Sequence, residues 1–306
     1  MTEAIRTEGL TKDYGGGRGL FDLDLEVREG EVFGYLGPNG AGKTTTIRQL
    51  MGLAFPTRGA ASIFGIDCHR QSVEVKRHVG YVPGEPPQFG GLRGREIVAY
   101  LGAMAGGVDR ERVAELVRRL ELDLSLRYRE YSTGNKKKLL LVIAFMHQPR
   151  LLVLDEPTSG LDPLNQQEFY TLVREARQGG ATVFLSSHVL SEVEHVCDRV
   201  GIIRAGRLVK VASLEELHEI RMHRVEMEFA GEAPVDAIRA VAGVDEVVAE
   251  GRHVRCVVRG SFEPLIAAVA GAHVVNMSSH EPSLEEAFLA YYAGAGTEPE
   301  AVAPSC

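Results

Sequence analysis

Cysteine is scarce in this chain, and its placement excludes two classes of site. The four cysteines are Cys68, Cys197, Cys256 and Cys306, and no two of them form a CxxC pair. Neither a zinc site nor a disulfide framework is indicated, and none of the ten histidines shows metal-ligand spacing. We therefore expect buried or free thiols in a reducing compartment.

Long hydrophobic runs are also missing. The longest spans Leu139 to Met146, far short of the roughly 20 apolar residues that cross a bilayer. Met1 to Arg6 lacks the basic-then-apolar pattern of a secretory signal. We expect no direct membrane insertion, and a protein that is cytosolic or attached to a membrane protein.

Basic residues are fewer than acidic residues. Lysine and arginine total 34 against 42 aspartates and glutamates, which gives a net charge of −8. An acidic balance argues against a nucleic-acid partner. The one dense basic run is Lys136 to Lys138, which forms either a solvated helix face or a positive field beside a bound phosphate.

The chain up to about residue 220 is typical of an α/β domain. Phe21 to Val27 alternates apolar and acidic residues, as in a half-buried antiparallel strand. Leu151 to Leu154 and Thr182 to Ser186 are uniformly apolar or small, which predicts strands buried on both faces of a parallel sheet. Arg110 to Leu120 carries a helical apolar stripe, within a helical region expected over about 85–131.

A break near Arg221 predicts a small second domain over 221–293. Ala237 to Gly243 resembles Leu265 to Gly271, and strand-like segments flank both. The order β-α-β-β-α-β is that of a ferredoxin-like α+β domain. Two unrelated alanine-rich helices are the alternative. We expect a last helix from Ser283 and a disordered tail over 294–306.

A glycine-rich loop from Gly37 to Thr44 fits the pattern G-x-x-x-x-G-K-S/T. Glycines let the backbone N–H groups turn toward phosphate oxygens, and the following helix adds its positive N-terminal end. We expect Lys43 to reach the β- and γ-phosphates and the Thr44 hydroxyl to bind Mg²⁺. The strand before the loop and the helix-forming run after it favour this site over an ordinary turn.

Two carboxylates end the apolar strand that begins at Leu151. Asp155 is expected to hold Mg²⁺ through water. Glu156 is placed to orient and deprotonate the water that attacks the γ-phosphate. The four apolar residues before them disfavour a merely exposed acidic pair.

A second phosphate cradle is predicted at Ser132 to Gly134, a short Ser-x-Gly turn that opens a helix. An ordinary helix cap is the alternative. This turn does not easily reach a phosphate bound at the glycine-rich loop, or P-loop, of its own chain. Two chains arranged head to tail would therefore complete two sites.

These motifs together resemble an ATP-binding cassette ATPase subunit over Ile5 to Leu217. Gly37 to Thr45 resembles Walker A, Leu151 to Glu156 Walker B, and Ser159 to Asp162 the D-loop. Tyr131 to Asn135 stands at the place of the family's signature. The resemblance implies the cofactors ATP and Mg²⁺, with Thr44 and Asp155 on the metal and Glu156, His188 and Lys43 as catalytic residues. It implies nucleotide contacts from Tyr14, Gly37, Asn39, Gly40, Ala41, Gly42, Lys43, Thr44, Thr45, Ser132, Gly134 and Asp162.

Two motifs depart from the family pattern. In the signature, Thr133 and Asn135 replace a glycine and a glutamine, while Ser132 and Gly134 are kept. After Pro83, Gly84 and Glu85 stand where the family usually has glutamine. Either Glu85 substitutes for that glutamine or the contact is lost.

The segment from Pro282 to Phe288 resembles the C-terminal extension of bacterial drug- and antibiotic-export ATPase subunits. This resemblance implies an ATPase homodimer that works with a separate membrane permease, on the inner face of the cell membrane. The permease is expected to meet the helical region after Gly84, including Leu92, Ile97, Val98, Tyr100 and Leu101. The alternatives are a soluble cassette ATPase and a regulatory switch whose second domain senses a ligand.

Overall fold

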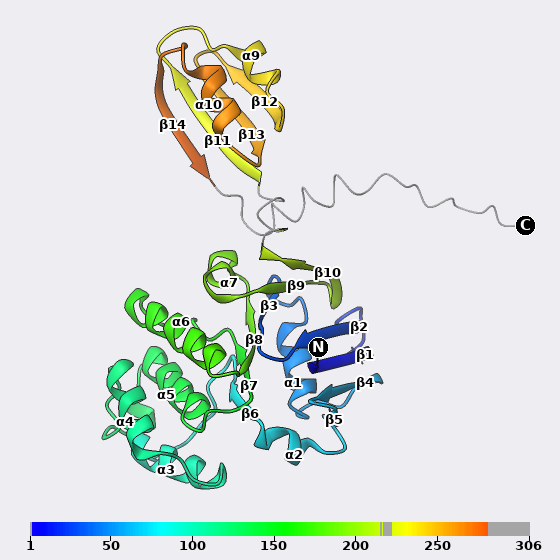
Figure 1. The fold of residues 1–306 in the computed structure, drawn as a ribbon, viewed down its shortest axis with the longest axis vertical. Helices are drawn as coiled ribbons and strands as arrows, with labels where there is room; N and C mark the ends of the chain where they lie inside the picture. Colours follow the sequence, from blue (N-terminus) through cyan, green and yellow to red (C-terminus); the bar gives the residue numbers. More distant parts are fainter. Residues whose placement is uncertain (1, 215, 217–221, 281–306) are drawn as a thin grey trace, which may run out of the picture. The chain divides into compact units, whose positions relative to one another are not determined.

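The chain divides into two compact units, Met1–Ala212 and Ser213–Cys306, in a computed structural model (Figure 1). The structure describes residues 2–214, 216 and 222–280. The helix expected from Ser283 and the tail 294–306 lie outside the described residues. The domain limits 1–220 and 221–293 stay predictions. Within the described residues, no helix is both long and apolar enough to span a bilayer.

A six-stranded sheet in the order β10-β9-β3-β8-β7-β6 forms the centre of the first unit. Its strands are β3 (Val32–Leu36), β6 (Val79–Val82), β7 (Leu151–Asp155), β8 (Thr182–Ser187), β9 (Arg199–Arg204) and β10 (Arg207–Ser213). Strands β3, β7 and β8 pair in parallel, and every residue in them is buried. This burial confirms the predicted parallel sheet covered by helices.

A second, antiparallel sheet in the order β2-β1-β4-β5 shares a core with the first. Its strands are β1 (Glu3–Asp13), β2 (Gly19–Arg28), β4 (Arg58–Ile63) and β5 (Ile66–Asp67). In β2 the alternate residues Leu23, Leu25 and Val27 are buried, as the period-two pattern predicts. The α/β fold with an antiparallel patch is therefore confirmed.

Helices α3 to α6 gather on one side of the first unit, and the antiparallel strands lie on the other (Figure 1). The helices are α1 (Lys43–Leu50), α2 (Ser72–Arg77), α3 (Gly94–Met104), α4 (Arg110–Arg119), α5 (Thr133–Phe145), α6 (Pro163–Gln178) and α7 (Leu190–Val196), with a 3-10 turn at Tyr128–Glu130. Helices α3 and α4 occupy the region predicted to be helical.

Helix α5 is buried on nearly all sides, which corrects the solvated-face interpretation of its basic run. Lys137 is 2% exposed and Lys138 is 8% exposed. Lys136 is partly buried, and its Nζ lies 5.4 Å from the centre of the Tyr128 ring. The solvated-face alternative is wrong because α5 is an inner helix, in which most of the apolar run after Lys138 is also buried.

The second unit has the predicted β-α-β-β-α-β order. Its elements are β11 (Met222–Phe229), α9 (Val235–Arg239), β12 (Val244–Glu250), β13 (His253–Arg259), α10 (Glu263–Val269) and β14 (Val274–His280). The sheet order is β12-β13-β11-β14, with antiparallel pairs throughout. Val225 and Phe229 of β11 share a core with Ile238 of α9 and Leu265 of α10.

Replacing Phe229 by alanine should lower the free energy of unfolding of the second unit by about 3–5 kcal/mol, because its ring is fully buried. Phe184→Ala is the matched variant in the first unit, where Phe184 lies 6.0 Å from Phe33, centre to centre. Calorimetry of the full chain should show two transitions, each lowered by one variant. A single transition lowered by both variants would show that the units do not unfold separately.

Candidate active site

The carboxyl ends of β3, β7 and β8 bring three loops to one edge of the sheet. Leu36 lies opposite Ser187 in one ladder, and Asp155 lies opposite Ser186 in the next. The Gly37 N–H donates to the Ser187 carbonyl at 3.2 Å. Ligands of open α/β sheets bind at this edge. The sheet therefore brings together the three motifs that the sequence separates.

The loop between β3 and α1 needs its glycines. Gly40 and Gly42 have φ angles of +80° and +111°, which side chains rarely allow. A Cβ on Gly37 would lie 2.3 Å from the Ile203 carbonyl oxygen. Asn39 and Ala41 belong to the same loop, and Thr45 lies in the first turn of α1. Their nucleotide contacts stay predictions.

Lys43 is buried, and its ammonium contacts three oxygen atoms. Its Nζ donates to the carbonyls of Gly37 and Pro38, at 2.6 and 3.2 Å. Glu156 Oε1 lies 3.2 Å from the same nitrogen but accepts no directed hydrogen bond from the residues described, so this contact is an ion pair. Two carbonyl oxygens therefore accept hydrogen bonds from the ammonium, and the carboxylate adds an ion pair. A bound phosphate must compete with them.

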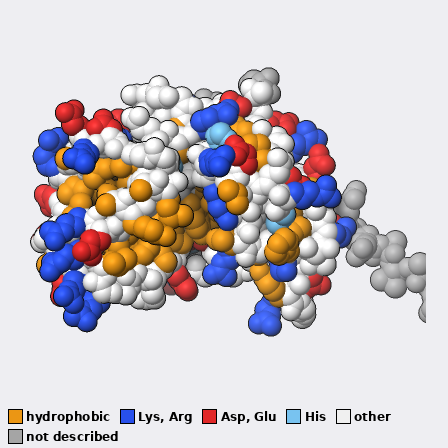
Figure 2. All heavy atoms as spheres, turned by 90° about the horizontal axis from the view of Figure 1, so that it is seen from below, with side chains coloured by type: hydrophobic (Ala, Val, Ile, Leu, Met, Phe, Trp, Pro, Cys, Tyr) orange, Lys and Arg blue, Asp and Glu red, His pale blue; other side chains and the backbone are white. Residues whose placement is uncertain are grey.

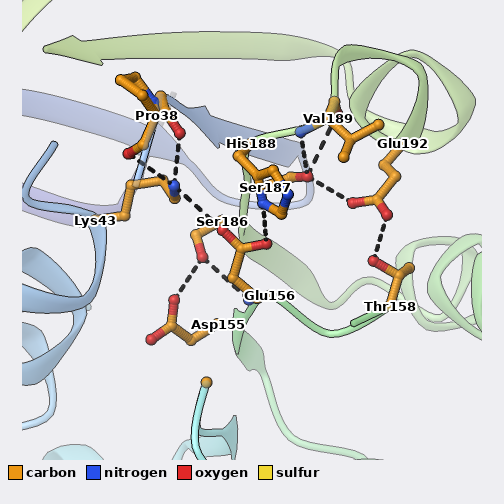
Figure 3. A network of polar contacts seen from close by, with 12 residues as sticks. Pro38, Lys43, Asp155, Glu156, Thr158, Ser186, Ser187, His188, Val189 and Glu192 are labelled. Carbon is orange, nitrogen blue, oxygen red and sulfur yellow. Dashed lines mark hydrogen bonds and ion pairs between the residues drawn. The ribbon is translucent and has the colours of Figure 1, made fainter. Parts of the chain in front are cut away.

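Hard oxygen donors converge at Asp155, which is fully buried. Its Oδ2 accepts from Thr44 Oγ1 at 2.9 Å, and its Oδ1 accepts from Ser186 Oγ at 2.6 Å (Figure 3 shows the Ser186 contact). A hydroxyl and a carboxylate fit Mg²⁺, which is usually completed by phosphate and water. The described residues contain no group of three or more His, Cys, Asp and Glu that could hold a metal ion.

Glu156 contacts both of the other residues predicted to be catalytic, Lys43 and His188. Its Oε2 lies 2.8 Å from His188 Nδ1, opposite the ion pair to Lys43 (Figure 3). The residue has a φ of +47°, uncommon outside glycine, and its N–H donates to Ser186 Oγ at 3.1 Å. Strained backbone of this kind concentrates at functional sites.

Sequence reasoning missed a carboxylate that joins two of these loops. Glu192, in the first turn of α7, accepts from Thr158 Oγ1 at 2.6 Å and from Ser187 Oγ at 2.5 Å (Figure 3). Thr158 follows Glu156 closely, and Ser187 directly precedes His188. No motif indicated Glu192; its only signal was its place in the helix after His188.

A second cluster lies where α5 and α6 begin. Ser132 caps α5 by accepting the Asn135 N–H at 3.2 Å. A Cβ on Gly134 would lie 2.7 Å from the Gly160 carbonyl oxygen. Asp162 caps α6, where hydrogen bonds from Asn165 hold the pKa of Asp162 below its usual value. In the described part of the chain, no hydrogen bond joins this cluster to the P-loop.

Two further predicted contacts lie at the margins of the site. Tyr14 is 51% exposed, in the turn between β1 and β2, with Lys12 Nζ 5.4 Å from its ring centre. The next strand contacts the P-loop, because a Cβ on Gly42 would lie 3.3 Å from the Gly19 carbonyl oxygen. Glu85 is exposed. The roles of Tyr14 and Glu85 stay predictions.

Comparison with known proteins gives the family. The ABC transporter family model matches residues 20–159. A bacitracin transport ATP-binding protein of Enterococcus faecalis is 37% identical, over 72% of each chain. A linearmycin resistance ATP-binding protein of Bacillus subtilis is 30% identical, over 93% of this chain and 97% of that protein. A solved structure of an ATP-binding subunit of an ABC transporter has a TM-score of 0.65 at 32% identity, over 70% of this chain and 92% of that one. The chain therefore belongs to the ABC transporter family and is an ATPase of that family.

Proposed function

We propose that two copies of this chain bind two ATP–Mg²⁺ between them and drive a separate membrane permease that exports a drug, antibiotic or lipid-like compound. The observation that carries the proposal is the convergence of Lys43, Thr44, Asp155, Glu156 and His188 at one edge of the sheet. The names of the bacitracin and linearmycin relatives support the class of compound.

Each of these five residues has one task. Lys43 binds the β- and γ-phosphates once they displace its carbonyl partners, and His188 holds the γ-phosphate. Thr44 and Asp155 would hold Mg²⁺, which would neutralise charge on the phosphate oxygens. Glu156 orients the attacking water and accepts its proton at the carboxylate.

The nucleotide-binding site of one copy is completed by residues of the other copy. Ser132 and Gly134 supply the second phosphate cradle, and Asp162 supports it from the start of α6. The lack of a described hydrogen bond between this cluster and its own P-loop supports this assignment. Two identical chains in head-to-tail apposition then form two equivalent sites.

The chain attaches to the membrane by binding the permease, which contacts an apolar surface of the helical region. Leu92, Tyr100 and Met104 are 45%, 63% and 69% exposed. Ile97 and Val98, predicted for the same surface, are buried, so they pack inside the unit and do not face a partner. Figure 2 shows hydrophobic side chains gathered on the face seen from below, the side of α2 and α3 in Figure 1. With a net charge of −8, the chain is repelled by anionic lipid, which favours attachment to a permease on the inner face of the membrane.

Glu156→Gln should keep ATP binding and slow hydrolysis by about 10²–10⁴, the usual contribution of a positioned general base. Because closure precedes cleavage, this variant should also form a lasting dimer with ATP–Mg²⁺, measured by light scattering. Lys43→Ala is the control, since it removes a phosphate contact and should give neither binding nor dimer. A strictly monomeric Glu156→Gln protein with ATP bound would contradict the composite site.

Glu192→Ala should lower the hydrolysis rate by about tenfold to a hundredfold, because it releases both loops that carry Glu156 and His188. ATP affinity should stay within about twofold, since Glu192 is not expected to contact nucleotide. Thr158→Val and Ser187→Ala each remove one of its two hydrogen bonds and should give smaller losses. Wild-type turnover in Glu192→Ala, measured by phosphate release, would show that the loops hold their positions without it.

Tyr100→Asp and Met104→Asp should release the chain from the membrane fraction of cells that contain its permease, while ATP binding is unchanged. A buried apolar contact loses stability when a charge is placed in it. Val248→Asp is the matched control, because Val248 is 50% exposed on β12 of the second unit. A chain that never co-purifies with a membrane protein, or binds protein-free anionic vesicles tightly, would favour a soluble switch or direct lipid binding instead.

A further inference from the structure

One buried cation beside the active site has no place in the mechanism above. Lys137 lies in the second turn of α5 and is 2% exposed. Lysine is almost never fully buried unless it is paired, because the charge loses its hydration. A burial this complete requires partners, and the structure provides them.

The ammonium of Lys137 is held by the loop that follows β6. Its Nζ donates to the carbonyl oxygens of Pro83 and Gly84, both at 3.3 Å. Burial lowers the pKa of Lys137 below its usual value, and the charges of Asp155 and Glu156 offset part of this shift. The charged form therefore has both hydrogen-bond acceptors and nearby carboxylates to compensate for burial.

The same loop touches the metal carboxylate. Strands β6 and β7 are parallel neighbours, with Val82 opposite Leu154, so Pro83 and Gly84 leave the sheet beside Asp155. A Cβ on Gly84 would lie only 3.0 Å from Asp155 Oδ2, the oxygen that also accepts from Thr44. Any shift of the Gly84 backbone would thus alter the space beside that oxygen.

We propose that Lys137 is a positioning residue for the metal site: it fixes the Pro83–Gly84 backbone against Asp155 and joins it to helix α5. Glu85, the side chain that follows, is exposed, so the loop contributes its backbone here. Residues that orient metal ligands without touching the metal commonly affect metal affinity or turnover by about tenfold to a hundredfold. This role deepens the proposed ATP–Mg²⁺ function and rests on it.

The test compares Lys137→Met with Lys137→Gln. Both side chains are one atom shorter than lysine. Methionine loses every donor, whereas glutamine keeps two N–H donors without the charge. Lys137→Met should weaken Mn²⁺ binding to the complex with a non-hydrolysable ATP analogue by about tenfold or more. It should also speed amide hydrogen exchange at Gly84 and Glu85 in the nucleotide-free protein. Lys137→Gln should restore most of both properties.

Lys136→Met is the matched control, one residue earlier on the same helix and partly exposed, and it should behave as wild type. Nucleotide binding without metal reports folding in every variant. Unchanged Mn²⁺ affinity and exchange in Lys137→Met would overturn the positioning role, as would equal losses in the methionine and glutamine variants. If the wild-type chain neither binds nor hydrolyses ATP–Mg²⁺, the proposed function itself fails, which is a separate outcome.

Discussion

Parallel pairing of three buried strands is the constraint on which the rest of the first unit depends. Strands β3, β7 and β8 have no exposed residue, so their order and register are fixed by packing on both faces. Parallel strands end at the same edge, and each of these three continues into a loop with a reactive side chain. A slip in one ladder would separate Glu156 from Lys43 or from His188.

The parts of the site that sequence predicted are those with a local chemical reason. Gly40 and Gly42 need positive φ angles, and Asp155 needs an apolar strand before it; both features are visible in the order of residues. The α/β class of the first unit and the order of helices and strands in the second were likewise predicted from the periodicity of apolar residues and from turn residues. Such features depend on near neighbours in the chain.

The parts that sequence missed depend on packing between distant segments. Lys136 to Lys138 have the composition of a helix surface, and only the position of α5 inside the unit shows that two of them are buried. Glu192 bonds Thr158, 34 positions away, through side chains of common types. Ile97 and Val98 were placed on the outer surface because their apolar character does not distinguish a core from an interface.

The first two turns of helix α5 make two different contacts. Its first residues follow Ser132, which caps the helix, and Lys137 reaches the loop beside Asp155. A helix is a rigid element over this length, so a movement of the cap displaces the lysine as well. Contact at the start of α5 is therefore mechanically connected to the loop beside Asp155, which Lys137 holds.

The left-handed backbone of Glu156 has a consequence for spacing. In an extended strand, neighbouring side chains point to opposite faces, so two consecutive carboxylates would be separated by the sheet. Strand β7 ends at Asp155, and Glu156 adopts a left-handed backbone conformation with a φ of +47°. Asp155 therefore contacts Thr44 while Glu156 contacts Lys43. The two consecutive carboxylates lie opposite two consecutive residues of the P-loop. An extended backbone at Glu156 would turn its carboxylate to the opposite face of the sheet from Asp155, away from Lys43.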